Sequence, residues 1–76
     1  MKKINWQSET DEYIGCRVRE SRQRLDMTQQ QLAEVLGVSY QQVQNYENGL
    51  NGISAVRLFV ICEILNVPLQ AMFPSR

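Results

Sequence analysis

Small and apolar residues recur at helical spacing in the middle of the chain, in the run QQQLAEVLGVSYQQVQNY over residues 29–46. Two short helices that cross at a sharp turn require residues of this kind at these places. Ala33 suits the closest approach of the two helices, and Gly37 can take the positive φ that ends the first one. The pattern predicts helices over Gln29–Leu36 and Tyr40–Glu47. Their inward-facing positions are Leu32, Leu36, Val38, Val43 and Tyr46.

Capping signals place the same boundaries independently of the hydrophobic pattern. Thr28 and Gln31 fit the capping box, in which each side chain hydrogen-bonds to the backbone of the other residue. Ser39 and Gln42 repeat this spacing at the start of the next helix. A third start at Ser54 lacks the Glu or Gln of the box, so a cap without the reciprocal bond is predicted there.

The segments on either side of this pair also follow helical spacing. Residues 1–9 are expected to form a flexible N-terminal arm, and Ser8 or Thr10 can cap a first helix that reaches Leu25. Ile14, Val18 and Leu25 give this helix its core side.

A fourth helix is predicted over Ala55–Leu65, after a turn at Asn48 and Gly49. Asn66 suits the closing turn, and Pro68 opens a last short helix. The fourth helix is expected to bury Leu58, Ile61 and Leu65. One face of the last helix carries Leu69, Met72 and Phe73, which we expect to close the core rather than to form an interface.

Composition agrees with an all-α fold. The 76 residues are 43% apolar with four glycines and two prolines, and we expect one compact helical domain over residues 10–76. No apolar run approaches the roughly 20 residues of a membrane span, and the N-terminus lacks the apolar segment of a signal peptide. We therefore expect a cytoplasmic protein. In that compartment Cys16 and Cys62 are expected to be small buried residues rather than a disulfide.

The third predicted helix has an exposed face made of side-chain amides. With Val43 at the centre of the buried side and about 100° per residue, Gln41 and Asn45 lie opposite it, flanked by Gln42 and Gln44. An amide offers a donor and an acceptor side by side, which matches the N6 and N7 edge of adenine in the major groove. Such a face is by itself an ordinary soluble surface. As the second helix of a tight pair, it is predicted to contact DNA bases.

Residues at the helix starts are further candidates for DNA contact. Tyr40 can touch a thymine methyl, a base edge or a phosphate. Gln29 opens the second helix, where its amide and the free N–H groups favour a phosphate. Gln42, on the flank, is assigned to the DNA backbone.

Charge counts against this interpretation. Eight basic and eight acidic residues cancel, and the arginines of the first helix alternate with acidic residues, as on a solvated helical face. A single copy is therefore expected to bind DNA weakly, because affinity for phosphates grows with the number of cationic contacts.

Taken together, these features resemble the lambda-repressor-like, or Xre-type, helix-turn-helix proteins of the phage repressor and Cro kind. The resemblance runs from Ile14 to Phe73 and rests on the segments IGCRVRESR, MTQQQLAEVLGVS, VQNYENG and ILNVPLQAMF. It implies five helices, of which the third is the recognition helix in the major groove.

The resemblance also implies roles for single residues. Gln29 and Asn48 match positions that hold the DNA backbone, and Arg22 matches one that pairs with a glutamate, here Glu47, to join the first helix to the third. The family's base-contacting positions correspond to Tyr40, Gln41, Gln44 and Asn45.

The loop after the third helix departs from the family pattern. Leu50 and Gly52 stand where the family often has a lysine or an arginine, which removes a backbone contact. Arg57 can replace that contact, or it can be a surface arginine without a role in DNA binding.

The sequence therefore predicts a transcriptional regulator that binds double-stranded DNA as a homodimer, on a palindromic operator with half-sites about one helical turn (roughly 34 Å) apart. The alternative is a protein-binding module, such as an antitoxin or anti-repressor that uses the same helical face, and zero net charge favours it. An enzyme is not expected, because the chain has no histidine, no metal-spaced cysteines and no Gly-rich phosphate loop. No cofactor, metal, small-molecule ligand or membrane partner is expected.

Overall fold

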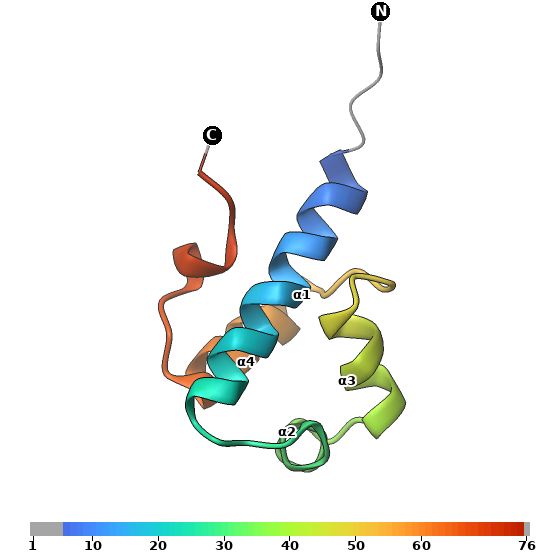
Figure 1. Cartoon of the computed structure of the whole chain (residues 1–76), viewed down its shortest axis with the longest axis vertical. Coiled ribbons are helices and arrows are strands. Elements are labelled where there is room, and N and C mark those ends of the chain that lie inside the picture. The colour runs from blue at the N-terminus through green and yellow to red at the C-terminus, as the bar shows by residue number, and fades with distance from the viewer. Residues whose placement is uncertain (1–5, 76) are drawn as a thin grey trace, which may run out of the picture.

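The computed structural model describes residues 6–75, and within them it contains helices and no strand. The elements are α1 (Trp6–Arg24), α2 (Gln29–Leu36), α3 (Tyr40–Glu47), α4 (Ala55–Leu65) and the 3₁₀ helix η1 (Leu69–Met72). In Figure 1, α1 runs along the length of the molecule, between α3 on one side and the C-terminal segment on the other. The fold is all-α, as predicted. The expected fifth helix is only a four-residue 3₁₀ turn, so the count of five helices is not confirmed.

Capping side chains define the starts of α2 and α3. The Thr28 hydroxyl accepts a hydrogen bond from the Gln31 N–H at 3.0 Å, and the Thr28 N–H donates to the Gln31 side chain at 2.8 Å, which confirms the first capping box. Ser39 accepts from the Gln42 N–H at 3.1 Å, but the Gln42 side chain accepts from Asn51 at 3.3 Å instead of closing the box. The second box was therefore predicted wrongly, because a loop residue outcompetes the cap backbone.

The other predicted ends are also present. Gly37 ends α2 at φ 75°, Gly49 turns the chain after α3 at φ 71°, and Asn66 ends α4 at φ 56°. Ser54 caps α4 by accepting from the N–H three residues on, without a reciprocal bond, as predicted. The boundaries of α2, α3 and α4 match the sequence prediction.

The start of α1 differs from the prediction. The helix begins at Trp6 rather than after Ser8 or Thr10. Glu9 lies in its first turn, and a carboxylate near a helix N-terminus is favoured by the helix dipole. Residues 6–9 therefore belong to the helix and not to an arm, and residues 1–5 of the predicted arm lie outside the described residues.

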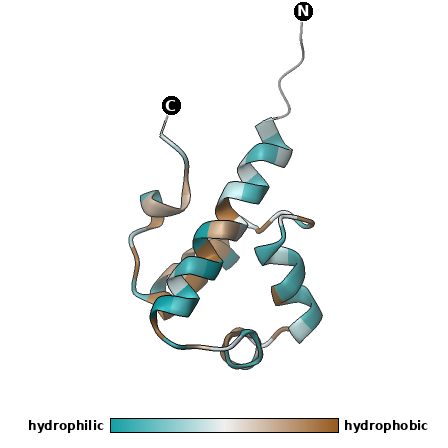
Figure 2. Cartoon of the chain, in the orientation of Figure 1, coloured by the Kyte–Doolittle hydropathy of each residue, from teal (hydrophilic) through white to brown (hydrophobic). Residues whose placement is uncertain are grey.

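The core lies where α1, α2, α3 and α4 meet. Figure 2 shows hydrophobic residues along α4 and mainly hydrophilic ones along the outer side of α3. Three expected core residues lie on the surface instead: Leu25 (48% exposed), Leu69 (41%) and Phe73 (43%). Leu25 is exposed because α1 ends at Arg24 and the chain then turns through a positive φ at Asp26. The buried apolar side chains are Ile14, Val18, Leu32, Ala33, Val43, Tyr46, Leu58, Ile61, Cys62, Leu65 and Met72.

The two cysteines are free and differ in burial. Cys62 is buried, and burial together with the nearby Glu63 carboxylate raises the pKa of its thiol. Cys16 is exposed on α1, so its predicted burial was wrong: it lies next to the buried face of the helix but points away from it. Among the described residues, no helix is long and apolar enough to cross a bilayer.

Two glycines allow α1 to approach the end of α3 closely. A Cβ atom on Gly15 would lie 2.4 Å from the carbonyl oxygen of Tyr46 and 2.7 Å from that of Glu47. A Cβ on Gly49 would lie 2.8 Å from the Cα of Glu12. Any side chain at Gly15 would therefore push the C-terminal end of α3 away from α1.

Candidate nucleic-acid interface

The outer face of α3 carries the side chains that the sequence predicts to contact bases. Tyr40 is 45% exposed and Gln41 is exposed, while Gln44 and Asn45 are half-buried at the edges of this face. Val43 is fully buried at the centre of the opposite side. The structure therefore agrees with the predicted phase at Val43 and Gln41, whereas Asn45, which was predicted to lie opposite Val43, is half-buried.

These side chains are paired along the helix, each with the residue one turn away. Gln41 Nε2 donates to Asn45 Oδ1 at 3.1 Å, and Gln44 Nε2 donates to the Tyr40 hydroxyl oxygen at 3.1 Å. Each amide still has an N–H and an acceptor lone pair for an outside partner. The pairs orient the polar groups before any ligand arrives, which lowers the entropic cost of binding.

A buried ion pair anchors the opposite end of α3. Arg22 Nε donates to Glu47 Oε2 at 2.7 Å and Arg22 Nη2 donates to Glu47 Oε1 at 3.0 Å. The Glu47 side chain is completely buried. Arg22 Nη1 also donates to the Met27 carbonyl at 2.7 Å, in the turn before α2. The resemblance implies this pairing, and the structure shows that it joins three segments of the chain.

Gln29 and Arg19 contact the same glutamate. Gln29 Nε2 donates to Glu47 Oε1 at 2.9 Å, which ties the start of α2 to the end of α3. Arg19 Nε lies 3.6 Å from Glu47 Oε1, and Arg19 Nη2 donates to Asn48 Oδ1 at 2.8 Å. We call the five residues of this network the polar cluster: Arg19, Arg22, Gln29, Glu47 and Asn48.

Arg19 has no predicted role in DNA binding, because the arginines of α1 alternate with acidic residues. The spacing between Arg19 and Arg22 indicates that both lie beside the end of α3, because residues three apart lie on the same side of a helix. The cluster also brings together Gln29 and Asn48, which the sequence places far apart.

Two other residues that were predicted to contact the DNA backbone form hydrogen bonds within the protein. Arg57 Nη1 donates to the carbonyl of Leu36 at 3.3 Å, at the end of α2, and Gln42 accepts from Asn51 at 3.3 Å. Arg57 therefore links α4 to α2. Both side chains keep N–H donors that these bonds do not use. The predicted DNA contacts of Arg57 and Gln42 therefore stay predictions.

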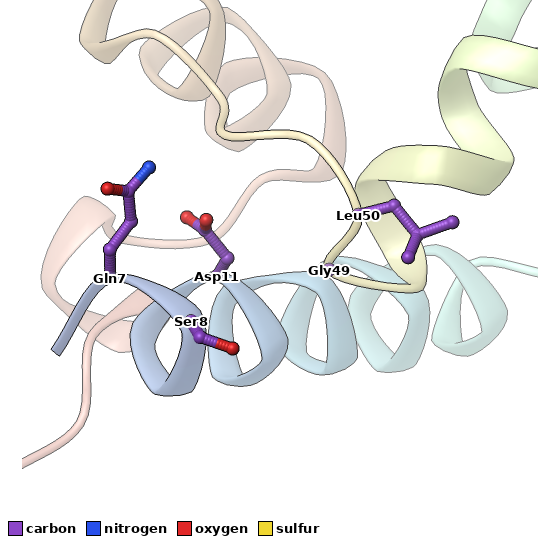
Figure 3. A pocket seen from close by; sticks show the side chains of 5 residues that line it. All are labelled: Gln7, Ser8, Asp11, Gly49 and Leu50. Carbon is purple, nitrogen blue, oxygen red and sulfur yellow. The ribbon is translucent and has the colours of Figure 1, made fainter. Parts of the chain in front are cut away.

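An open hollow of about 250 Å³ lies where α1 meets the turn after α3. Figure 3 shows Gln7 and Asp11 rising on the same side of α1, while Ser8 points to the other side and Leu50 points away. Its walls are the side chains of Gln7, Ser8, Asp11 and Leu50 and the turn at Gly49.

The described residues also contain no group of three or more His, Cys, Asp or Glu side chains that could hold a metal ion. The chemistry that this surface offers is therefore hydrogen bonding by neutral amides, a phenol and guanidinium groups.

Comparison with known families gives a consistent result. Residues 18–72 match the helix-turn-helix family, which covers most of the chain. A transcriptional regulator in the ATPase CF(0) region of Rhodospirillum rubrum is 48% identical over 63 residues, covering 83% of this chain and 58% of that protein. An HTH-type transcriptional regulator of Sinorhizobium medicae is 46% identical over 63 residues, covering 83% and 45%. The chain thus spans about half the length of the curated relatives it matches.

A more distant relative carries a different name. The antitoxin PezA of Streptococcus pneumoniae is 33% identical over 54 residues, covering 71% of this chain and 34% of that protein.

Solved structures share the same arrangement of helices. The restriction-modification controller protein C.AhdI of Aeromonas hydrophila matches with a TM-score of 0.75 and 26% identity, over 82% of this chain and 94% of that one. Hydroxypropylphosphonic acid epoxidase of S. wedmorenis matches with a TM-score of 0.79 and 25% identity, over 84% of this chain but only 34% of the enzyme. The helical unit alone therefore does not specify an activity. By its sequence match and its fold, this chain belongs to the lambda-repressor-like, or Xre-type, family of helix-turn-helix transcriptional regulators.

Proposed function

We propose that the protein is a sequence-specific DNA-binding regulator that places α3 in the major groove. The observation that carries this proposal is the orientation of the amides: they face outward on the second helix of a tight pair, and Gln41 and Asn45 bond to each other rather than to the core. An amide can make two hydrogen bonds to the adenine edge. The proposed base contacts are Tyr40, Gln41, Gln44 and Asn45, and the proposed backbone contacts are Gln29, Gln42, Asn48 and Arg57.

We further propose that two copies bind together, on a palindromic site. α4 exposes Val56 (76%), Phe59 (55%) and Val60 (39%). Because these positions are three and four residues apart, they form one apolar stripe on the helix surface. A second copy covering the stripe would bury it and would double the number of phosphate contacts, which a chain of zero net charge needs. The relatives named as transcriptional regulators support action in the cytoplasm, where the DNA is.

The direct test is selection of bound sites from a random pool of DNA duplexes, using the purified chain. The proposal expects an enriched palindrome whose half-sites are about one helical turn apart. Recovery of unselected sequence would contradict sequence-specific binding. Sedimentation with and without the selected duplex would show whether two copies bind.

A protein-binding module is the second candidate, favoured by the zero net charge and by the similarity to the antitoxin PezA. The two candidates differ in their response to salt. Affinity for DNA falls steeply between low and moderate salt because counterions are released from the phosphates. Binding of a duplex that does not weaken with salt would favour the protein-binding module.

Gln29→Ala offers a separate test of the backbone contacts. Because Gln29 lies at the start of α2 and touches Glu47, its loss should weaken binding to selected and random duplexes alike. A loss confined to the selected duplex would contradict a backbone role.

A further inference from the structure

Arg19 stands apart from the other arginines by its position beside the recognition helix. Arg17 pairs with Glu20 and the Ala71 carbonyl, Arg57 bonds to the end of α2, and Arg22 is buried on Glu47. The Arg19 side chain is 41% exposed and reaches the C-terminal end of α3. It therefore brings an accessible positive charge to the edge of the proposed DNA surface.

The hydrogen bonds of Arg19 leave a row of unused donors. Its Nη2 group donates to Asn48 Oδ1 at 2.8 Å and to the Glu47 carbonyl at 3.5 Å. A guanidinium has five N–H groups, and no hydrogen bond among the described residues uses the two on Nη1. Asn48 is exposed and its Oδ1 accepts from Arg19, and no hydrogen bond within residues 6–75 uses the two N–H groups on its Nδ2.

This orientation of Asn48 follows from chemistry. The reversed amide would set N–H donors of Asn48 against N–H donors of Arg19, which repel each other. The edge shared by Arg19 and Asn48 therefore presents donors, as an anion requires.

The distribution of charge also favours binding of an anion at this edge. Within the polar cluster, Arg22 and Glu47 neutralise each other, so the charge of Arg19 remains in excess. Among the described residues, the acidic ones that lie against the turn after Asn48 are Asp11 and Glu12, both about two helical turns from Arg19 along α1, roughly 10 Å or more away. Arg19 shares the single Glu47 carboxylate with Arg22, so one positive charge of the cluster stays uncompensated.

We infer that Arg19 and Asn48 together form a binding site for one phosphate of the DNA backbone, in which Arg19 supplies the charge and fixes the Asn48 amide with its N–H groups outward. This inference rests on the proposed function, and it adds Arg19 as a residue that the DNA phosphate contacts. The other role open to Arg19 is purely structural: it would only compensate the negative end of α3.

Arg19→Gln, compared with Arg24→Gln, separates the two roles. Arg24 lies on the same helix and is exposed, so both variants lose one charge. Arg19→Gln should weaken binding to selected and random duplexes alike by roughly tenfold. It should also reduce the slope of log affinity against log salt by about one per copy. Equal effects of the two variants, or an unchanged salt slope with a lower Tm, would overturn the inference.

Asn48→Asp, compared with Gln23→Glu, tests the outward donors while keeping the fold. The aspartate still accepts from Arg19, so a structural role predicts a retained fold and no loss of DNA binding beyond that of Gln23→Glu, which adds the same charge at an exposed position of α1. The phosphate site predicts a much larger loss for Asn48→Asp, because two donors become acceptors. Similar losses for the two variants would contradict it.

Titration with inorganic phosphate, followed by NMR, keeps the inference separable from the proposed function. Phosphate should shift the signals of Arg19 Nε–H and of the Asn48 side-chain amide in the wild type, and should not shift the latter in Arg19→Gln. If the chain selects no DNA site but shows these shifts, the proposed function fails and the anion site stands. Absence of the shifts in a chain that binds DNA would refute the site alone.

Discussion

The outer face of α3 and its C-terminal end differ in the hydrogen-bond partners of their polar side chains. On the outer face, Gln41 bonds to Asn45 and Gln44 bonds to Tyr40, so these hydrogen bonds stay within the helix. At the C-terminal end, Glu47 receives hydrogen bonds from α1 and from the start of α2. The outer residues can therefore change without disturbing the core, whereas Glu47 cannot. The eight residues of α3 thus carry both the proposed recognition surface and the contacts that hold the helix in place.

Removal of Glu47 should have the largest effect on stability. Glu47→Ala leaves the Arg22 guanidinium, whose side chain is only 10% exposed, without its carboxylate. An unpaired buried charge should lower the free energy of unfolding by about 3–5 kcal/mol, which is a large part of the stability of a small domain. Chemical denaturation followed by circular dichroism measures this change.

Glu34→Ala is the matched control. Glu34 is exposed on α2, and its loss should change the free energy of unfolding by about 0.5 kcal/mol or less. If the two variants are equally stable, the polar cluster does not hold α3 and the contrast between its two ends is lost.

Gly15→Ala tests the contact between α1 and the end of α3 without changing charge. The new methyl group would overlap the carbonyl oxygens of Tyr46 and Glu47 at 2.4 and 2.7 Å. Overpacking of this kind should lower the free energy of unfolding by about 1–3 kcal/mol, in spite of the better helix propensity of alanine. Thermal unfolding measures the change.

Gly52→Ala provides the comparison for this substitution. Its Cβ would have Asp11 Oδ1 as the nearest atom, at 3.8 Å, so there is room for it. The variant should be neutral or slightly more stable, because alanine restricts the unfolded chain. A Gly15→Ala protein as stable as Gly52→Ala would show that the end of α3 can move away from α1 without loss.

Local signals in the sequence were sufficient to predict where α2, α3 and α4 begin and end. Caps and left-handed turn residues act on the backbone within a few positions, so Thr28, Gly37 and Ser54 identify the helix ends without knowledge of the rest of the fold. The buried phase of α3 follows from the spacing around Val43 in the same way.

Contacts between distant segments could not be predicted from such signals. The link from Arg19 to Asn48 and the close approach at Gly15 depend on where α1 crosses α3. The exposure of Leu69 and Phe73 depends on how the 3₁₀ turn packs, since only Met72 points inward from it. A resemblance to a family supplied the pairing of Arg22 with Glu47, which spacing alone does not give.

The two helix caps offer a finer test of how far local bonds stabilise this region. Thr28 takes part in a complete capping box, whereas Ser39 makes only one of the two bonds. Thr28→Ala and Ser39→Ala each remove one hydrogen bond from the N–H three residues on, so each should lower the free energy of unfolding by about 1 kcal/mol. The bond from the backbone N–H of residue 28 to the Gln31 side chain survives the first substitution. Urea denaturation of both variants measures the two losses, and a much smaller loss for Thr28→Ala would mean that the surviving bond holds the start of α2 on its own.

Gln41→Ala should have the smallest effect on folding and a clear effect on DNA binding. Gln41 is exposed and bonds only to Asn45, so the free energy of unfolding should change by less than about 0.5 kcal/mol. Affinity for the selected duplex should fall by about 1–3 kcal/mol, with a relaxed preference at one base pair, because an amide contact to a base edge is lost. Competition binding against duplexes altered at single positions measures both.

Asn45→Ala and the double variant show whether the pair acts as a unit. If Gln41 orients Asn45 for base contact, the double variant should lose less affinity than the sum of the two single losses, because either change already breaks the pair. Strict additivity would mean that each amide contacts DNA on its own. Equal losses on selected and random duplexes would mean that the outer face of α3 holds the backbone and not the bases, and the proposed division of α3 into a recognition face and an anchoring end would then be wrong.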